Sequence, residues 1–334
     1  MKKNYFIGID VSMEKLDVCL LAKGSELPLE ELIIKNEASD IQKYFKRIIK
    51  KWGKDEMFVC LEHTGHYGLL LCAILQQLDI AYAAVPALEI KRTQGISRGK
   101  TDKIDARRIA TYAWRYEDKL KETVLPSEQL ILIKELVSVR DQFVKMSTQL
   151  QNSLKSHQIV SKVINNAVVI KVIKSQITQL KSQIEEIEQK LVRIVEENES
   201  IKKNYDLLKS VNGIGPVTAI ALIVSTHNFQ RITDGRKFNT YTGIAPFENK
   251  SGKTDKGARV SNLANKKMKA LLHNGACSAI AHDEELKVYY KRKLDEGKHK
   301  MSVLNAIACK LVYRAFAVIK RQTPYVNLYQ HKFA

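Results

Sequence analysis

Residues 5–20, YFIGIDVSMEKLDVCL, contain two apolar runs separated by a short polar segment, and Asp10 closes the first run. Residues 5–9 are rich in aromatic and branched side chains and are bounded by polar residues, which predicts a buried strand. A carboxylate at the end of such a strand is costly unless hydrogen-bond donors or a cation stabilise it. Asp10 therefore either caps the turn that follows, toward Ser12, or binds a metal ion.

Further strand and helix patterns alternate along the first 125 residues. Short runs rich in branched side chains predict more strands, at residues 16–22, 31–35, 57–61 and 80–85. Helical patterns cover residues 39–51, with Ser39 as the cap, and residues 66–78. Glu62 directly follows one of the predicted strands and is a second carboxylate at a strand end. The alternation predicts an α/β domain with a mixed sheet over residues 1–125.

A second acidic pair lies in residues 98–113, RGKTDKIDARRIATYA, where Thr101 is suited to cap a helix. Asp102 and Asp105 are three residues apart, so both lie on one face of the first helical turn. Like charges this close raise each other's pKa unless a cation or basic neighbours share the site. Ordinary surface pairs could neutralise both acids, and first-turn acids also favour the helix dipole. The basic residues available for such pairs are Arg98, Lys100, Lys103, Arg107 and Arg108.

Asp10, Glu62, Asp102 and Asp105 together would bring four carboxylates from separate elements to one place. Ribonuclease H-like nucleases likewise deliver their first carboxylate from the first strand of a sheet. Four oxygen donors suit two hard divalent ions, expected to be Mg²⁺, which can bind the attacking and leaving oxygens of a phosphodiester. The neighbouring bases, Arg98 and Lys100 included, would then hold a nucleic-acid backbone beside the acids.

The composition favours a polyanionic partner. The 334 residues include 55 Lys and Arg against 36 Asp and Glu, a formal net charge of +19. Residues 209–334 alone carry 22 basic and 8 acidic side chains, so the C-terminal part supplies most of the excess. A basic balance of this size favours nucleic acid over an acidic membrane as the partner.

The length allows two or three domains, each with its own core. No apolar run reaches the roughly 18 residues of a membrane span, and the first residues lack a signal-peptide pattern. The five cysteines are odd in number, sit in apolar surroundings and form no CxxC pair. This usage is typical of buried reduced thiols and argues against a disulfide framework or structural zinc. We expect a soluble intracellular protein.

Residues 126–208 change to a coiled-coil pattern. Two stretches show apolar residues at alternating four- and three-residue steps, and the longer, second register runs from Ile173 to Leu208 over about five heptads. In it, Asn198 is a polar seam residue of the kind that fixes register and partner number. The gap at residues 157–166 either turns the chain back into an antiparallel hairpin or lets the long helix pair with another subunit. We expect a homo-oligomer, a dimer or a tetramer, although an intrachain hairpin would explain the pattern too. The first register consists of Leu132, Leu136, Val139, Phe143, Met146 and Leu150.

Two segments of residues 209–334 are suited to nucleic acid. Gly213 and Gly215 lie between apolar helical runs, as in a helix-hairpin-helix whose tight turn exposes backbone N–H groups to a phosphate. A plain helical packing turn would show the same pattern. Residues 247–259 predict a loop, and residues 261–272 start a basic amphipathic helix. Their bases form either a solvated face or a contact with nucleic-acid backbone, which the charge balance favours: Lys250, Lys253, Lys256, Arg259, Lys266, Lys267 and Lys269.

Three motifs resemble a known family. GIDVSMEKLDV, LEHTGHYG and RGKTDKIDARRIA are similar to the motif regions of DEDD-type insertion-sequence transposases of the IS110 family, whose N-terminal domain is RuvC-like and thus ribonuclease H-like. Asp10, Glu62, Asp102 and Asp105 fall on the four acidic positions of that motif. The resemblance covers nearly the whole chain. It implies a RuvC-like catalytic domain, a coiled coil or helical hairpin, and a mainly α C-terminal transposase domain, at residues 1–125, 126–208 and 209–334.

The same resemblance singles out Ser251. In the family, a GLxP stretch leads to a Ser-Gly pair that bears the nucleophile. Here GIAP at residues 243–246 departs slightly from that stretch, and Ser251 precedes Gly252. Ser261 is the nearest rival, but it is suited to cap a helix and lies where the family has a structural Ser-Lys region, whereas this chain has Asn262.

The resemblance implies a transposase or recombinase that cleaves and rejoins DNA at element ends and target. The acidic tetrad would hold Mg²⁺, and the serine would attack a phosphodiester. It also implies oligomerisation, a structured guide RNA encoded by the element, and a cytoplasmic, nucleoid-associated protein of bacteria. Two other functions fit the residues: a RuvC-like structure-specific nuclease in which water attacks, and a nucleic-acid-binding protein whose catalytic fold is inactive.

Overall fold

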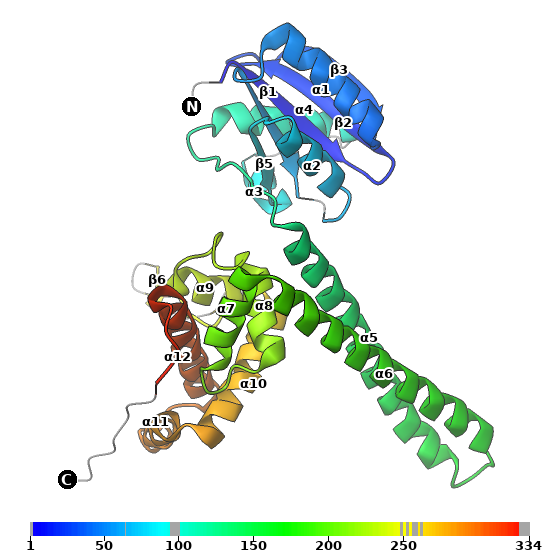
Figure 1. The fold of residues 1–334 in the computed structure, drawn as a ribbon, viewed down its shortest axis with the longest axis vertical. Coiled ribbons are helices and arrows are strands. Elements are labelled where there is room, and N and C mark those ends of the chain that lie inside the picture. The colour runs from blue at the N-terminus through cyan, green and yellow to red at the C-terminus, as the bar shows by residue number, and fades with distance from the viewer. Residues whose placement is uncertain are drawn as a thin grey trace. The chain divides into compact units, whose positions relative to one another are not determined.

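The computed structural model describes residues 3–63, 65–93, 101–247, 250–251, 254–255, 260 and 263–326. The chain forms two compact units, Met1–Leu125 and Pro126–Ala334, and each has a hydrophobic core of its own. The first unit is α/β and the second is mainly helical (Figure 1), as predicted. The segments predicted as separate middle and C-terminal domains belong to one compact unit.

The first unit is built on a five-stranded mixed sheet with the order β3-β2-β1-β4-β5. The central strand β1 pairs antiparallel with β2 and parallel with β4, which confirms the predicted mixed sheet. β1 and β4 extend beyond their predicted ends, so Asp10 and Glu62 lie within strands rather than after them. The strands are β1 (Tyr5–Val11), β2 (Lys15–Ala22), β3 (Pro28–Lys35), β4 (Met57–Glu62) and β5 (Tyr82–Val85).

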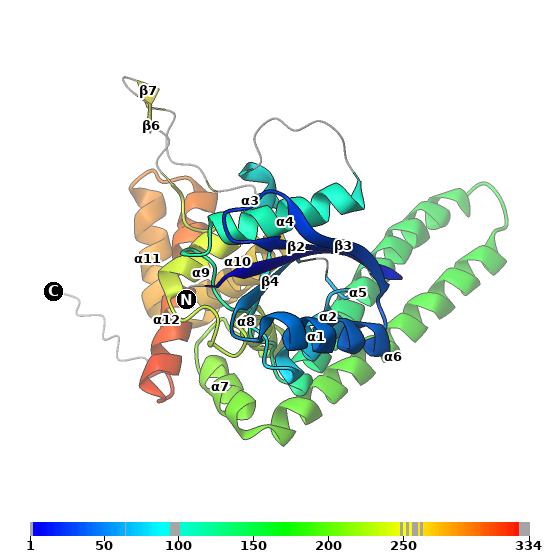
Figure 2. The same ribbon diagram turned by 90° about the horizontal axis from the view of Figure 1, so that it is seen from above.

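Helices cover both faces of this sheet, and the alternation of side chains along β1 decides what lies on each. Ile7 and Ile9 are buried in the core that includes residues of α1 (Ala38–Trp52) and α2 (Leu69–Gln77). Phe6 points to the opposite face and joins a core with residues of α3 (Ala87–Arg92) and α4 (Asp102–Arg115). Figure 2 shows α4 on one side of the strands and α1 and α2 on the other. Asp10, an even-numbered position like Phe6, therefore belongs to the α4 face.

Gly8 lets α4 lie directly against β1. A Cβ atom at this position would be 2.2 Å from the Ala106 carbonyl oxygen and 2.2 Å from the Ala110 backbone nitrogen. Both contacts are with backbone, which no side-chain rotation can relieve. The close approach brings the first turn of α4 to the part of the sheet that carries Asp10.

The helix starts were predicted with mixed success. The hydroxyl of Thr101 accepts a hydrogen bond from the Ile104 amide and caps α4 as predicted. Ser39 was wrong as the cap of α1, because this helix begins at Ala38 and the N-cap residue Glu37 makes no side-chain capping bond. The second helix is also shorter than predicted, beginning at Leu69 rather than residue 66.

The second unit begins with an antiparallel hairpin of two long helices, α5 (Glu128–Val160) and α6 (Ala167–Glu197). The chain turns back at the predicted gap. The interpretation of Asn198 as a seam residue was wrong: α6 ends before it, and its side chain accepts a hydrogen bond from the Ile201 amide to cap α7 (Glu199–Lys209). A polar side chain in a heptad pattern can equally be a helix cap, because both roles call for a short amide or hydroxyl.

The first predicted seam is only partly buried. Leu132, Val139 and Met146 are 47%, 38% and 48% exposed, whereas Leu130 and Ile133 are buried. The hairpin therefore turns a different face of α5 toward the core than the heptad pattern indicated. A heptad-spaced apolar stripe of α5 stays on the surface.

Helices α8 to α12 complete the second unit around a second core, and Gly213 is essential to its packing. Gly213 has φ +93°, and a Cβ atom there would lie 2.5 Å from the Gly275 carbonyl oxygen. Asn265, rather than Ser261, supplies the side-chain cap of α10. The remaining elements are α8 (Pro216–Thr226), α9 (Gly235–Thr242), β6 (Lys250–Ser251), β7 (Thr254–Asp255), α10 (Lys266–His282), α11 (Glu284–Asp295) and α12 (Lys300–Arg321).

α12 is long and apolar enough to cross a membrane by length and composition. Its apolar side chains, such as Ile307, Leu311 and Ala315, are fully buried among the other helices of the unit. The helix is therefore the centre of a helical core.

We predict that Gly8→Ala destabilises the first unit by on the order of 3 kcal/mol, because the new methyl group collides with the α4 backbone. Trp52 and Trp114 are the only tryptophans of the sequence, and both lie in this unit. Urea denaturation followed by tryptophan fluorescence therefore reports on it selectively. Equal stability of Gly8→Ala and wild type would contradict the close approach.

Candidate active site

Three carboxylates from neighbouring strands lie in a row on the α4 face of the sheet. Asp10 of β1 is paired in register with Asp17 of β2, so their side chains point to the same face. On the other side, Ile9 of β1 is level with Leu61 of β4, which places Glu62 next to Asp10. The order Asp17, Asp10, Glu62 thus follows the strand order β2-β1-β4.

The first turn of α4 adds Asp102 and Asp105 to this face. α4 lies against β1, β2 and β4, the three strands that carry the row of acids. Its first-turn acids are also stabilised by the positive end of the helix dipole. The structure thus gathers all four predicted acids, and Asp17 as a fifth, around one face of the sheet.

Asp10 experiences this concentration of charge directly. Its pKa is raised to about 6, first by burial and then by the negative charges of Asp102, Asp105, Glu62 and Asp17. A carboxyl group in such surroundings binds a proton or a cation more readily than an isolated one. The electrostatics of the site therefore favour an added positive charge beside Asp10.

Two basic side chains already balance part of the charge. The Lys15 ammonium lies 2.8 Å from an Asp102 carboxylate oxygen and 2.9 Å from one of Asp17, and these partners raise the pKa of Lys15 above its usual value. Arg108 donates to Asp105 across 2.9 Å. Lys15 lies on the same strand face as Asp17, two residues away, so one ammonium bridges the sheet and α4.

The other bases near the second acidic pair have a different partner. Arg107 donates two hydrogen bonds, of 2.9 and 2.7 Å, to one oxygen of Glu31, and Lys103 lies 2.9 Å from the other oxygen. These contacts tie α4 to β3. Of the bases that could have neutralised the acid pair, Lys103 and Arg107 contact Glu31, whereas Arg108 pairs with Asp105.

The donor set fits a hard divalent cation, since every acid supplies oxygen ligands and no ion pair joins Asp10 to a base within the described part of the chain. The acids do not form a ready coordination sphere, however. Within the described residues, no three His, Cys, Asp or Glu side chains are arranged to hold a metal ion. Lys15 occupies one oxygen of the Asp102 carboxylate, so a cation bound there would compete with the Lys15 ammonium for this acid.

Sequence reasoning overlooked Asp17 and Lys15. Asp17 is only 5% exposed, and an acid is rarely so buried unless it has a partner, here Lys15. A signal was present in KLDV, where an acid interrupts a strand pattern level with Asp10. Hairpin register would have been needed to see that Asp10 and Asp17 face each other.

Several predicted nucleic-acid contacts lie outside the described residues: Arg98, Lys100, Lys253, Lys256 and Arg259. Lys250 and Ser251 are described by their backbone, which forms β6 and pairs antiparallel with β7. Ser251 is level with Thr254, at the turn end of this short hairpin.

The remaining predicted contacts fall in the second unit. Packing against Gly275 accounts for Gly213 without a phosphate, whereas the space around Gly215 at the start of α8 is open. Lys267 forms an ion pair with Asp141, and burial together with Arg140 lowers its pKa. Lys266 is exposed at the start of α10.

Comparison with protein families identifies both units. A DEDD-type family model described as "Transposase" matches residues 7–158. A second model, described as "Transposase IS116/IS110/IS902 family", matches residues 205–291.

Individual relatives agree with these matches. The transposase for insertion sequence element IS1533 of Leptospira borgpetersenii is 23% identical over 261 residues, which cover 71% of this chain and 73% of the relative. The pilin gene-inverting protein of Moraxella bovis is 24% identical over 333 residues, 97% of this chain and 98% of the relative. T. thermophilus RuvC, solved in complex with a Holliday junction substrate, aligns with 36% of this chain and 99% of its own at 12% identity and a TM-score of 0.29.

We predict that Asp10→Asn stabilises the first unit above pH 6 in the absence of divalent cations. The pKa of Asp10 is about 6 in the folded protein against 3.8 for an ordinary aspartate, so folding favours the protonated carboxyl group. Its ionisation costs stability progressively as the pH rises from about 4 through about 6. Removing the charge should therefore raise the free energy of unfolding at pH 8 by about 1 kcal/mol, a value that allows for screening by solvent.

The gain should disappear below about pH 4, where the carboxyl group is protonated in both states. Urea denaturation with tryptophan fluorescence at pH 4 and pH 8 checks this. Asp118→Asn, a change of an exposed aspartate in the same unit, is the matched control. An Asp10→Asn variant that is less stable than wild type at pH 8 would show that the carboxylate is favourably paired.

Proposed function

Because this chain belongs to the IS116/IS110/IS902 family of transposases and is thus a DNA transposase or recombinase, we propose that it cleaves and rejoins DNA at the acidic face between β1 and α4. The observation that carries this proposal is the gathering of Asp10, Glu62, Asp102 and Asp105 on one face, where burial and then the charges of the other acids raise the pKa of Asp10. A purely structural site would pair each acid with a base. In this proposal, residues 1–125 form a RuvC-like catalytic domain in which the four acids are the catalytic residues.

Divalent ions, Mg²⁺ in our proposal and two in number, would be held by Asp10, Glu62, Asp102 and Asp105. When bound, such ions polarise the scissile phosphate and stabilise the charge of the leaving oxygen. Lys15 keeps Asp102 and Asp17 neutralised in their absence. Arg108 fixes the Asp105 carboxylate on the helix surface, which limits the movement needed to form the site.

We assign the nucleophile to Ser251. Its hydroxyl oxygen would attack phosphorus, so that an oxygen–phosphorus bond forms while the bond from phosphorus to a sugar oxygen breaks. The hydroxyl proton passes to a carboxylate or solvent, and the leaving oxygen takes up a proton. A serine hydroxyl is a poor nucleophile at neutral pH, and its neighbours Asn249, Lys250 and Lys253 cannot readily accept a proton. The acidic site would supply the missing activation.

The proposal extends to the partners. The basic C-terminal part would bind the DNA backbone of element ends and target. Gly215 and Lys266 are proposed contact positions that lie within the described residues. A structured guide RNA, self-association into a dimer or tetramer, and work at the nucleoid in the cytoplasm follow from the family resemblance. The acidic site could also act as a hydrolytic nuclease, and the nature of the DNA product separates the two.

Asp102→Asn should reduce Mg²⁺-dependent strand cleavage at least about a hundredfold, because a ligand that binds and orients the ions loses its charge. DNA binding should change little, since the basic surface is untouched. Cleavage of a labelled DNA end and filter binding measure the two effects. Mg²⁺ should also raise the Tm of wild type but not that of the variant. Cleavage at the wild-type rate in Asp102→Asn would refute the metal site, and Asp118→Asn serves as the matched control.

Ser251→Ala should abolish strand exchange as fully as Asp102→Asn, because no oxygen–phosphorus bond can form at alanine. Wild-type protein trapped with a DNA end should carry a covalent nucleotide on Ser251, identified by peptide mass spectrometry. Ser251→Cys keeps a nucleophile and separates chemistry from folding. An adduct on Ser261, or active cleavage without any adduct, would favour the alternative serine or hydrolysis by water.

A further inference from the structure

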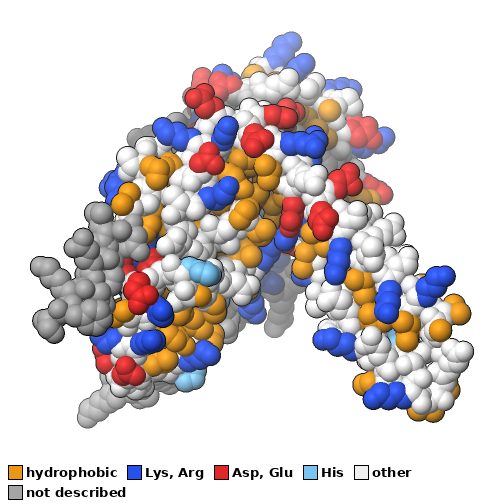
Figure 3. Space-filling model, turned by 60° about the horizontal axis from the view of Figure 1, so that its bottom comes forward, with side chains coloured by type: hydrophobic (Ala, Val, Ile, Leu, Met, Phe, Trp, Pro, Cys, Tyr) orange, Lys and Arg blue, Asp and Glu red, His pale blue; other side chains and the backbone are white. Residues whose placement is uncertain are grey.

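Charge is distributed unevenly along the α5–α6 hairpin. Its distal half, residues 142–184, contains six lysines and no acidic residue. Its base, residues 128–141 and 185–197, contains eight acidic and four basic residues. In Figure 3 the projecting arm shows blue and orange side chains toward its end, where no red ones are visible. One end of the hairpin is thus basic and the other acidic.

An apolar stripe follows α5 on the outside of this hairpin. Leu132, Val139, Met146 and Val160 are 47%, 38%, 48% and 41% exposed, and they occupy a heptad ladder in which only Ser153 is polar. Side chains seven residues apart lie on nearly the same side of a helix, so the stripe is continuous along the arm. Apolar side chains at this spacing are typical of a helix that contacts a second helix.

The distal end adds more exposed aliphatic surface. We call it the tip patch and define it as Ile159, Val163, Ile164, Val168, Val169 and Val172. Their exposed fractions reach 86% at Val163 and 76% at Val168. Contiguous exposed apolar side chains mark interaction sites in soluble proteins.

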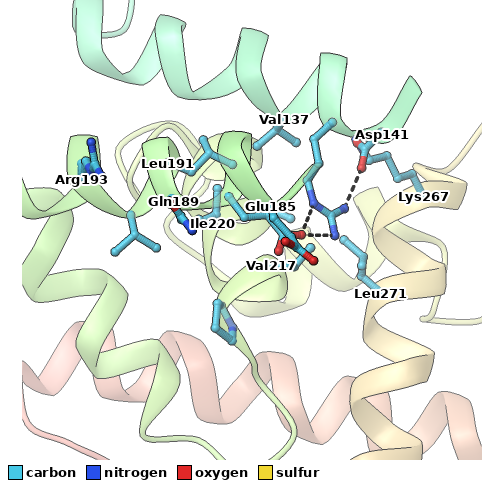
Figure 4. Close-up of a pocket in the computed structure, with 15 residues that line it drawn as sticks. Val137, Asp141, Glu185, Gln189, Leu191, Arg193, Val217, Ile220, Lys267 and Leu271 are labelled. Atoms are coloured by element: carbon cyan, nitrogen blue, oxygen red, sulfur yellow. Dashed lines mark hydrogen bonds and ion pairs between the residues drawn. The ribbon is translucent and has the colours of Figure 1, made fainter. Parts of the chain in front are cut away.

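The base of the hairpin carries a recess to which an aliphatic patch could bind. A cavity of about 620 Å³ opens between α5, α6, α8 and α10, with Val137, Leu191, Ile220 and Leu271 among its walls. Figure 4 shows these side chains around the cavity, together with Glu185. The recess is apolar inside, and acids and bases alternate around it, with Glu185, Glu188 and Arg193 contributed by α6.

We infer that the hairpins of two copies of this chain pair antiparallel about a two-fold axis, so that the basic tip of each lies beside the acidic base of the other. If the two hairpins paired in parallel, the lysines of one tip would face the lysines of the other. In the antiparallel arrangement, lysines face glutamates at both ends. The inference rests on the proposed self-association and specifies its surface and orientation.

The levels along the hairpin agree with this arrangement. Arg140 donates to Glu188 across 2.7 Å, which fixes how α5 and α6 are aligned and places Met146 near the level of Ser182. The apolar stripe is centred on Met146, between Leu132 and Val160. The charge pattern is centred within about one helical turn of the same level, between Lys174 and Glu185. The axis would therefore cross the middle of the arm.

The middle of the arm is suited to contact its own copy. Apart from Lys145 and Lys181, the surface at this level is uncharged, so few like charges meet there when two copies pair. Amide and hydroxyl side chains can bond to their symmetry mates because they both donate and accept. The residues concerned are Thr148, Gln149, Gln151, Asn152, Thr178, Gln179, Ser182 and Gln183.

A second copy fits this surface better than nucleic acid does. The exposed side chains of the tip patch are aliphatic, whereas nucleic-acid bases stack on aromatic or arginine side chains. The acids at the base would repel phosphates along the same arm. Lysines that bind only phosphate would also leave the apolar stripe uncovered.

The test reverses charge at each end of full-length protein. The tip variant is Lys171→Glu/Lys174→Glu and the base variant is Glu185→Lys/Glu186→Lys, all on the surface of α6. In either variant both contacts of a two-fold pair become repulsive, so the dissociation constant should rise at least about tenfold in sedimentation equilibrium. In an equimolar mixture both contacts of a mixed pair are again attractive, and association should return to near the wild-type level.

Each other outcome is informative. Unchanged association of both variants, or loss that the mixture does not restore, overturns the antiparallel pairing while leaving self-association in place. A wild type that stays monomeric with and without DNA overturns both. Loss of DNA binding in the tip variant, with association intact, identifies the arm as a nucleic-acid surface. Circular dichroism must show unchanged helix content in both variants.

A cross-link locates the axis. Only a residue near a two-fold axis meets its own copy, so Met146→Cys should form an intermolecular disulfide on mild oxidation, whereas Val124→Cys should not. Both are made in a Cys277→Ser background, because Cys277 is exposed. Equal cross-linking at both positions, or at neither, contradicts the placement of the axis. DNA cleavage by the uncross-linked variants separates this question from the catalytic proposal.

Discussion

The contact between Gly8 and the backbone of α4 is the constraint on which the candidate active site depends. It brings the helix so near to β1 that only hydrogen fits at the α carbon. A helix held one side-chain layer farther away would leave Asp102 and Asp105 above the sheet rather than beside Asp10. The strand register places Asp17 and Glu62 on either side of Asp10. Gly8 sets the short distance between α4 and β1.

This gathering of acids is unfavourable for folding alone. Burial and four neighbouring carboxylates raise the pKa of Asp10, while Lys15 and Arg108 offset the charge of the acids around it. The surrounding α/β core supplies the stability that allows such a site, because nearly every apolar side chain of β1 and β4 is fully buried. A site that strains its own fold, yet is rich in hard oxygen ligands, is typical of metal-dependent phosphoryl transfer.

The sequence predicted the mixed sheet, two acids next to strand ends and the capped helix, because short runs of aromatic and branched side chains and a threonine suited to cap a helix are local signals. It did not reveal Asp17 and Lys15 as parts of the site, since their role follows from pairing between strands. The sequence also did not show which acid each basic residue of α4 contacts. Arg107 and Lys103 reach Glu31 of β3, which lies 76 and 72 residues earlier in the chain.

The heptad pattern of the middle segment shows why periodicity alone is ambiguous. A heptad identifies a face that will be covered, but the same repeat arises whether the cover is the chain's own second helix or another molecule. Here the hairpin buries Leu130 and Ile133, and the heptad ladder of Leu132, Val139 and Met146 stays outside. Asn198 marks a break between helices rather than a register. A seam that the sequence maintains and the chain does not bury is best explained by a partner helix, and the opposite charges at the two ends of the arm select the antiparallel orientation of that partner.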